Sequence, residues 1–126
     1  MSMQWNDADL TSIAQHDEVG IASYRPDGTL RNYVTIWAVE TDGRVYVRSA
    51  YGVDNPWYRR AVAAGRGSIQ IDGIAHDVEF VPADASEQAA VDDAYRSKYA
   101  ARYADIIDGI TAESMHDVTL RLELAS

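Results

Sequence analysis

Hydrophobic and polar residues alternate along several short segments of the chain, a pattern typical of strands with one buried face. The segments EVGIASY (18–24), TLRNYVTIWAV (29–39) and VYVRSA (45–50) predict three consecutive strands. Pro-Asp-Gly at 26–28 and Asp-Gly at 42–43 supply the turns between them. We therefore expect a three-stranded antiparallel meander in the first half of the chain.

Helical patterns separate the remaining strands. A helix capped by Asn55 runs from Pro56 to about Ala64, because proline suits a first helical turn. Asp84 and Glu87 have the spacing of a capping box and begin a long helix. This long helix ends near Gly109. The other predicted elements are a short helix capped by Asn6 or Asp7, and strands at 68–71, 75–81 and 118–124.

Six short, mostly antiparallel strands in 126 residues favour a closed or nearly closed barrel, because closure leaves no exposed sheet edge. The chain contains no linker, repeat or low-complexity tract. The pattern therefore predicts a single α+β domain over residues 1–126 with a barrel-like sheet.

Composition narrows the possible partners. A net charge of −9 and a pI of about 4.5 argue against general binding to nucleic acid or anionic lipid, which requires a basic surface. The amino terminus lacks the apolar segment of a signal peptide, and no apolar run approaches the roughly 20 residues of a membrane helix. We expect a cytoplasmic protein.

Familiar catalytic patterns are missing from the sequence. The chain has no cysteine, which excludes disulfides, thiolate metal sites and thiol nucleophiles. His16, His76 and His116 are each followed by aspartate, but their spacing matches no metal-ligand pattern. There is also no G-x-S-x-G, G-x-G-x-x-G or Walker motif. We expect no metal site.

One stretch of this acidic chain is positively charged. Residues 46–61 read YVRSAYGVDNPWYRRA, and the span from Arg44 to Arg66 holds five arginines and one acid, Asp54. Alternation on its strand directs Arg48 outward, and the arginines of the following helix start oppose the helix dipole. Either these arginines pair with surface acids, or they hold an anionic group.

The series TLRNYVTIWAV, VYVRSAYG and NPWYRRA, followed by a strand pair, resembles the split β-barrel superfamily over roughly residues 16 to 124. This superfamily includes pyridoxamine 5'-phosphate oxidase-like flavoproteins and deazaflavin-dependent nitroreductases, and the nearest match is a small uncharacterised family within it. The resemblance implies a six-stranded antiparallel split β-barrel and a homodimer. It also implies FMN or a deazaflavin (coenzyme F420) in a groove at the dimer interface.

The resemblance also implies a set of cofactor-binding residues. The phosphate end falls on Arg48, Ser49, Gly52, Trp57 and Tyr58, with Arg59 alongside; Arg31 is a further phosphate partner, and Thr35 and Trp37 could meet the ring. One departure is Ala50, where many deazaflavin reductases carry lysine. Another cation must then replace that lysine, or the cofactor is absent.

Tyr95, Tyr99 and Tyr103 recur every four residues, which fits either a packing face of the long helix or the wall of a ligand site. The resemblance implies that Tyr99 and Tyr103 line a substrate site, where a tyrosine could orient a substrate or donate a proton. The favoured function is a small oxidoreductase that transfers hydride to a small molecule. The alternatives are a non-catalytic ligand-binding protein and a cofactor-free enzyme with a tyrosine-lined cleft.

Overall fold

The computed structural model describes residues 5–50 and 52–125, and its sheet curls into a barrel with helices packed outside it. The elements are α1 (Asp7–Gln15), β1 (Val19–Ser23), β2 (Val34–Ile36), β3 (Ala38–Thr41), β4 (Arg44–Arg48), α2 (Pro56–Ala64), β5 (Arg66–Ile71), β6 (Ile74–Pro82), the 3-10 turn η1 (Ala85–Glu87), α3 (Gln88–Tyr99), α4 (Ala104–Ile110), the 3-10 turn η2 (Glu113–Val118) and β7 (Thr119–Leu124). The α+β barrel prediction is confirmed.

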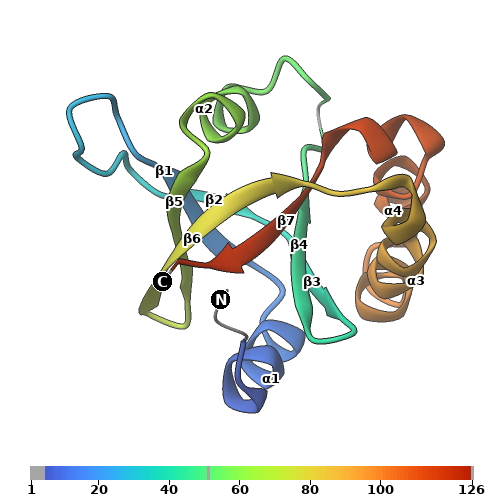
Figure 1. Cartoon of the computed structure of the whole chain (residues 1–126). Coiled ribbons are helices and arrows are strands. Elements are labelled where there is room, and N and C mark those ends of the chain that lie inside the picture. The colour runs from blue at the N-terminus through green and yellow to red at the C-terminus, as the bar shows by residue number, and fades with distance from the viewer. Residues whose placement is uncertain (1–4, 51, 126) are drawn as a thin grey trace.

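The described sheet has seven antiparallel strands in the order β2-β1-β5-β6-β7-β4-β3 (Figure 1). Its two edge strands, β2 and β3, are consecutive in the chain and are separated by Trp37 alone. The predicted strand 29–39 is therefore two strands that pair with different partners, β1 and β4. Both pairings of the expected meander form, but its middle strand is divided, so the two strand pairs lie at opposite ends of the sheet order.

Trp37 explains why the segment bends instead of continuing as one strand. Its ring leaves the sheet and stacks on Tyr99 of α3, with ring centroids 4.1 Å apart and planes inclined by 6°. The chain on either side then pairs with strands at the two ends of the sheet. The bend at Trp37 thus brings the two edges together and nearly closes the barrel.

Two apolar clusters lie on opposite sides of the barrel wall. On β4, Val45 and Val47 face the barrel interior and are fully buried, as the alternation predicts. Tyr46, on the other face, packs with Val39 of β3 against α3 and α4. Figure 1 shows these two helices together on one side of the barrel, with α2 and α1 at its two ends.

Within the described residues, no helix is both long enough and apolar enough to span a bilayer.

The predicted long helix is interrupted. Its capping box forms as expected, with Asp84 and Glu87 at η1, but α3 ends at Tyr99 and α4 begins at Ala104. The carbonyl of Tyr99 accepts hydrogen bonds from the amides of Arg102 and Tyr103, which turns the chain. This turn lets α4 contribute to the same apolar cluster that α3 covers.

Gly67 allows β1 and β5 to approach closely. It lies opposite Ser23 in the ladder, and both residues are buried. A Cβ atom at this position would lie 2.0 Å from the carbonyl oxygen of Ala22 and 2.7 Å from the Phe80 ring. Any side chain here would therefore displace backbone, so the curvature of the sheet at this point depends on glycine.

Candidate functional site

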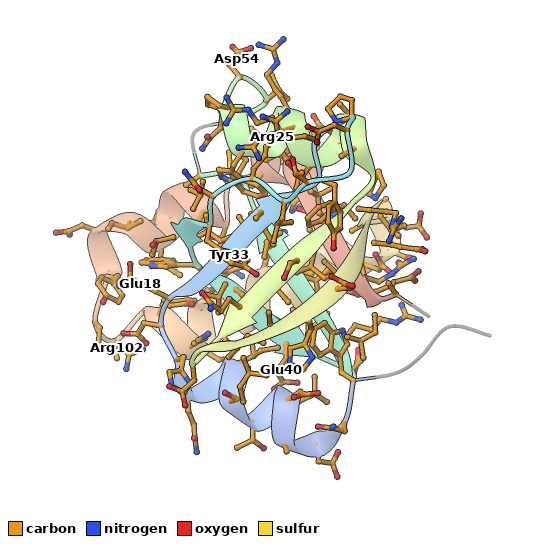
Figure 2. All side chains as sticks on the ribbon, turned by 90° about the vertical axis from the view of Figure 1, so that its left-hand side faces the viewer. Glu18, Arg25, Tyr33, Glu40, Asp54 and Arg102 are labelled. Carbon is orange, nitrogen blue, oxygen red and sulfur yellow. The ribbon has the colours of Figure 1, made fainter. Side chains whose placement is uncertain are left out.

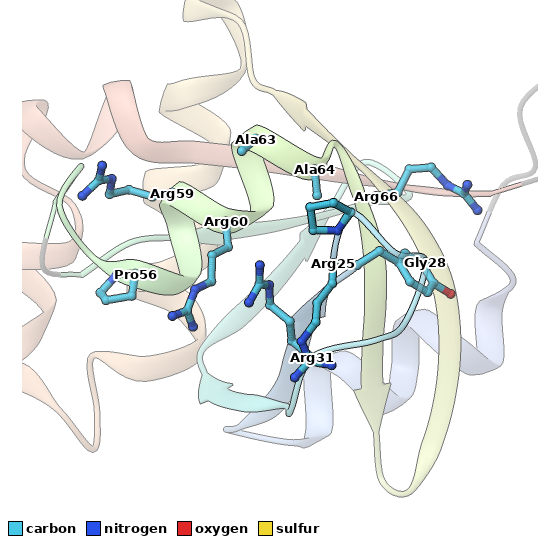
Figure 3. A pocket seen from close by; sticks show the side chains of 11 residues that line it. Arg25, Gly28, Arg31, Pro56, Arg59, Arg60, Ala63, Ala64 and Arg66 are labelled. Carbon is cyan, nitrogen blue, oxygen red and sulfur yellow. The ribbon is translucent and has the colours of Figure 1, made fainter.

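An open groove of about 1010 Å³ lies between α2 and the connection from β1 to β2 (Figure 3). Its walls, as far as residues 5–50 and 52–125 form them, carry five arginines and no acidic residue, and we call it the arginine groove. The residues that line it are Tyr24, Arg25, Pro26, Gly28, Arg31, Pro56, Arg59, Arg60, Ala63, Ala64 and Arg66.

The β1–β2 connection positions two of these arginines. Arg25 and Arg31 flank a tight turn closed by hydrogen bonds from the Arg25 amide to the Thr29 carbonyl and from the Gly28 amide to the Arg25 carbonyl, at 2.8 and 2.9 Å. Gly28 has a φ of 90°, which favours glycine in this turn. The two arginines therefore stand on either side of one turn, next to α2. Figure 2 shows Arg25 beside α2 and Glu40 toward the other end of the barrel.

Helix α2 and strand β5 position the other three. Arg59 and Arg60 project from the first turns of α2, and Arg66 begins β5 just after Gly65 ends that helix. In Figure 3, Arg60 extends from α2 toward the β1–β2 connection, and Arg31 extends from that connection toward α2. Arg59 and Arg66 lie at opposite ends of the groove.

The ion pairs divide the arginines into two groups. Arg44, Arg48, Arg96, Arg102 and Arg121 each lie within ion-pair distance of an aspartate or glutamate. The five groove arginines form no such pair within residues 5–50 and 52–125. Every unpaired arginine of the described chain thus lines one groove, although acids outnumber basic residues by 20 to 11. This partition disfavours the surface-pair interpretation of Arg59 and Arg60.

Two groove arginines differ in how they are held. The Arg25 guanidinium donates to the Leu30 carbonyl at 3.1 Å and to the Thr29 hydroxyl at 3.3 Å, so its own loop fixes it. The Nε of Arg31 is buried and has no hydrogen-bond partner in the described part of the chain. A buried donor without a partner is costly, and an anionic ligand beside it would relieve that cost.

Asp27 is the acid closest to these arginines along the loop, and its carboxylate is engaged elsewhere. It accepts hydrogen bonds from the Thr29 amide at 2.9 Å and from the Thr29 hydroxyl at 2.6 Å. These bonds, and more weakly the charges of Arg25 and Arg31, hold the pKa of Asp27 below its usual value. Asp27 therefore stabilises the turn and leaves the groove cationic.

An aromatic ring lies at one end of the groove. The Arg66 guanidinium carbon is 5.5 Å from the centroid of the Tyr24 ring, a cation–π contact. The Tyr24 hydroxyl donates to Asp77 at 2.8 Å, and this hydrogen bond is the main reason that the pKa of Tyr24 is raised. The ring is thereby held in place at the groove wall.

Of the residues expected to bind a cofactor, the structure places Arg31 and Arg59 in the arginine groove. Trp57 lines a small cavity of about 20 Å³ that shares Arg31 and Arg60 with the groove. Arg60 lines both cavities. These four residues form one region of the surface.

The expectation that Arg48 points outward into a ligand site is corrected by the structure. Arg48 leaves the barrel face as predicted, but α3 and α4 cover that face and its side chain is 0% exposed. Its guanidinium donates to Asp92 at 2.5 Å, to the Gln88 side chain and the Ile110 carbonyl at 2.9 Å, and to Thr119 at 3.0 Å. Arg48 therefore forms a buried ion pair with Asp92 outside the arginine groove.

The remaining expected binding residues lie elsewhere. Thr35 is exposed on edge strand β2, and Trp37 is stacked on Tyr99. The Ser49 hydroxyl donates to the Gly52 carbonyl at 2.6 Å, and the Tyr58 hydroxyl donates to the Asp117 carbonyl at 3.2 Å. None of these five residues lines the arginine groove, so their cofactor-binding roles stay predictions without support from this geometry.

The tyrosine stripe packs as core. Tyr95 and Tyr99 are 0% exposed, and burial raises the pKa of both hydroxyls. The Tyr99 hydroxyl lies 2.6 Å from the Asp17 carbonyl and 3.1 Å from the Ala38 carbonyl, and donates to them. Neighbouring Lys98, whose pKa burial lowers to about 8, donates to the same Ala38 carbonyl at 2.6 Å. These groups join α3 to the barrel, which favours the packing interpretation.

Changing Tyr99 to phenylalanine is expected to lower the free energy of unfolding by about 1 kcal/mol, the usual net value of one buried hydrogen bond. Anion binding should stay unchanged, because Tyr99 lies outside the arginine groove. Denaturant titration and calorimetry on the same variant measure both quantities. Tyr103→Phe is the control: its hydroxyl is half-buried and 3.4 Å from Asp17, so a smaller loss is expected. A Tyr99→Phe variant that keeps its stability but loses turnover would restore the catalytic interpretation.

Sequence reasoning missed Tyr24 and Arg25 and weighed Arg66 only as the boundary of the charged stretch. A local signal exists for Arg25 and Arg31, which stand three residues before and after Gly28 and so flank the same turn. No local pattern connects that turn with α2. Only the pairing of β1 with β5, which places Ser23 opposite Gly67, brings the two charged segments together.

The histidines contact aspartates other than their sequence neighbours. His16 lies 3.7 Å from Asp72, His76 lies 3.4 Å from Asp9, and His116 lies 3.1 Å from Asp92. Across the residues that the structure describes, no group of three or more potential ligand side chains is arranged to hold a metal ion.

Solved structures of low sequence identity share this fold. The heme storage protein HutZ from Vibrio cholerae is 15% identical with a TM-score of 0.64, over 98% of this chain and 92% of HutZ. A FAD-binding protein from Mesorhizobium loti is 16% identical with a TM-score of 0.59, over 100% of this chain and 94% of that one. An F420 reductase is 15% identical with a TM-score of 0.53, over 92% of each chain. These similarities confirm the split-barrel fold.

No curated protein matches the sequence significantly. Residues 9–122 match a family described as "Uncharacterized protein conserved in bacteria (DUF2255)". The matched span includes every residue of the arginine groove. The expected relation to a small family on the split-barrel fold is thereby confirmed, and the chain belongs to this bacterial family.

Proposed function

We propose that this protein binds a flavin-type cofactor, FMN or a deazaflavin, with the phosphate in the arginine groove, and that it acts as a small oxidoreductase. The observation that carries the proposal is the partition of the arginines: those without a carboxylate partner all line one groove. The fold supports it, because a FAD-binding protein and an F420 reductase share the same barrel.

The side chains of the groove fit a phosphate group. A guanidinium presents parallel N–H donors that match two phosphate oxygens, and Arg31 offers a buried Nε without a partner. The start of α2 adds to this, since Asn55 makes no side-chain capping bond and helix N-termini favour anions. Arg31, Arg59 and Arg60 would hold the phosphate, and the bound cofactor would supply hydride transfer to a small-molecule substrate.

A homodimer, which the resemblance to split-barrel proteins implies, belongs to the proposal. Trp57 and the valines of β4 are covered within one chain, so they require no partner. Large apolar side chains are instead exposed near the groove: Val34 on β2 and Val62 on α2, which are 40% and 49% exposed. A second copy that covers these two elements would also enclose the groove.

Titration of the purified protein with FMN and with a deazaflavin, followed by fluorescence, tests the proposal. Arg60→Ala should weaken binding by about tenfold or more, since a hydrogen bond to a charged group contributes roughly 1.5–3 kcal/mol. Arg96→Ala is the matched control: it removes the same charge from an exposed pair with Asp93 outside the groove, and binding should stay within about twofold. A protein that binds neither cofactor, or an Arg60→Ala variant that binds like the parent, would overturn the proposal.

A non-catalytic binding protein on the same fold is the second candidate, because one of the structural neighbours is a heme storage protein. Its chemistry also suits the groove, since an anionic group on any ligand could pair with the arginines. Including heme in the same titration separates the two candidates. Binding of heme with no binding of either flavin-type cofactor would favour the second.

A further inference from the structure

We infer that the arginine groove recognises two linked phosphates attached to a planar aromatic group, the chemistry of a nucleoside diphosphate, in preference to a single phosphate ester. The inference rests on the proposed function in placing an anion in this groove. It goes further by naming the class of ligand, which would make a molecule with a terminal diphosphate a better ligand than FMN.

The number of guanidinium groups without an acidic partner carries the first step. A phosphate monoester has three terminal oxygens and a charge of about −1.5 to −2, so two arginines in paired hydrogen bonds nearly neutralise it. Five arginines line the groove, none of them paired with an acid in the described chain. One phosphate would leave several of these positive charges facing one another without a counterion. A terminal diphosphate carries more negative charge than a monoester and matches the arginines more closely.

The extent of the groove carries the second step. Arg25, Arg31 and Arg60 occupy the space between the β1–β2 connection and α2, and Arg59 and Arg66 lie beyond them at the two ends (Figure 3). A volume of about 1010 Å³ is at the upper end of ligand pockets, which run from roughly 300 to 1,000 Å³. The positive charge is therefore distributed along a site of nucleotide size, and no single point concentrates it.

The Tyr24 ring carries the third step, because it indicates how the ligand is oriented in the groove. Tyr24 is held by its bond to Asp77 at the end of the groove where Arg66 lies over the ring. Aromatic faces stack on nucleobases, and arginine strengthens such contacts. At the other end, Pro56 and Arg59 mark the start of α2, which favours an anion. A base at Tyr24 would thus direct the phosphates along the arginines toward α2.

Calorimetric titration of the parent protein at constant ionic strength tests the inference with five probes: phosphate, pyrophosphate, AMP, ADP and citrate. Pyrophosphate should bind about tenfold or more tightly than phosphate, and ADP should exceed AMP by a similar factor, because each added charged contact contributes at least about tenfold. Equal affinities for phosphate and pyrophosphate would overturn the inference. Citrate that binds as tightly as pyrophosphate would also overturn it, since the site would then be a general polyanion site.

Two variants separate the parts of the site. Arg31→Ser should reduce the affinity for pyrophosphate and ADP alike by about tenfold. Tyr24→Leu should leave pyrophosphate binding unchanged and lower the affinity for ADP to that of pyrophosphate, because only the stacking face is lost. A Tyr24→Leu variant that keeps the full ADP affinity would contradict the placement of the base. Thermal melting of each variant confirms its fold, and Arg60→Ser replaces Arg31→Ser if the latter does not fold.

A comparison of FMN with ADP distinguishes failure of this inference from failure of the proposed function. ADP should bind about tenfold or more tightly than FMN, because its terminal phosphate adds a charged contact. If FMN binds as tightly as ADP and pyrophosphate binds no better than phosphate, the inference fails and the flavin proposal stands. If pyrophosphate is preferred but neither flavin nor deazaflavin binds, the diphosphate site stands and the oxidoreductase proposal fails.

Discussion

Replacement of Arg48 by alanine is expected to lower the free energy of unfolding by about 3–5 kcal/mol, the usual cost of removing one partner from a buried ion pair. Arg48 is fully buried, and its guanidinium reaches four acceptors on α3, α4 and β7. The Asp92 side chain is only 13% exposed. Without Arg48, its carboxylate would stay buried with His116 as its remaining close partner. Denaturant unfolding of the parent and the variant measures the difference.

Arg44→Ala is the control for this experiment. Arg44 also pairs with a glutamate, Glu87 at 3.0 Å, but its side chain is 56% exposed. Exposed pairs contribute about 0–1 kcal/mol, so this variant should unfold close to the parent. An Arg48→Ala variant that is as stable as Arg44→Ala but binds phosphate more weakly than the parent would show that Arg48 belongs to a ligand site.

Substitution of Gly67 by alanine is expected to cost at least about 3 kcal/mol, the upper end of ordinary overpacking, or to prevent folding. The new methyl group would lie 2.0 Å from a backbone oxygen of β1, and backbone in a paired strand cannot rotate away as a side chain can. The Phe80 ring on the neighbouring strand blocks the other direction. Thermal melting and the yield of folded protein provide the measurement.

Gly109→Ala provides the matched control, because it adds the same methyl group to a glycine in α4 that has nothing within 4 Å of the new atom. Alanine is favoured over glycine in a helix by roughly 0.5–1 kcal/mol, so this variant should equal or exceed the parent in stability. If Gly67→Ala melts like Gly109→Ala, β1 and β5 can separate without cost and the close approach is not essential.

The alternation of residues along a strand predicted the face to which each side chain points. It did not predict which elements cover that face. On β4 the alternation assigns Val45 and Val47 to the barrel interior, and both are buried there. The same alternation directs Arg48 to the other face, and the structure confirms that direction. The cover on that face comes from α3 and α4, at least 40 residues after Arg48 in the chain, and no periodicity within 45–50 encodes their position.

The candidate site shows the same division. Arg31 and Arg59 were expected at a phosphate site, and both line the arginine groove. Arg25 was missed because its position near α2 depends on the pairing of β1 with β5 and on the close approach at Gly67. The second strand was predicted as continuous because its residues alternate well, but the stacking of Trp37 on Tyr99 bends it. Contacts distant in sequence decide each of these differences.

The position of β7 in the sheet has a consequence for synthesis of the protein. β7 is the last strand of the described sheet to be made, yet it pairs with β6 on one side and β4 on the other. Until residues 119–124 leave the ribosome, both neighbours present unpaired backbone, and Val47 and Phe80 lack the leucines that pack against them. The barrel therefore closes only after translation has passed this strand, and a nascent chain that stalls earlier exposes two strand edges to chaperones or to aggregation.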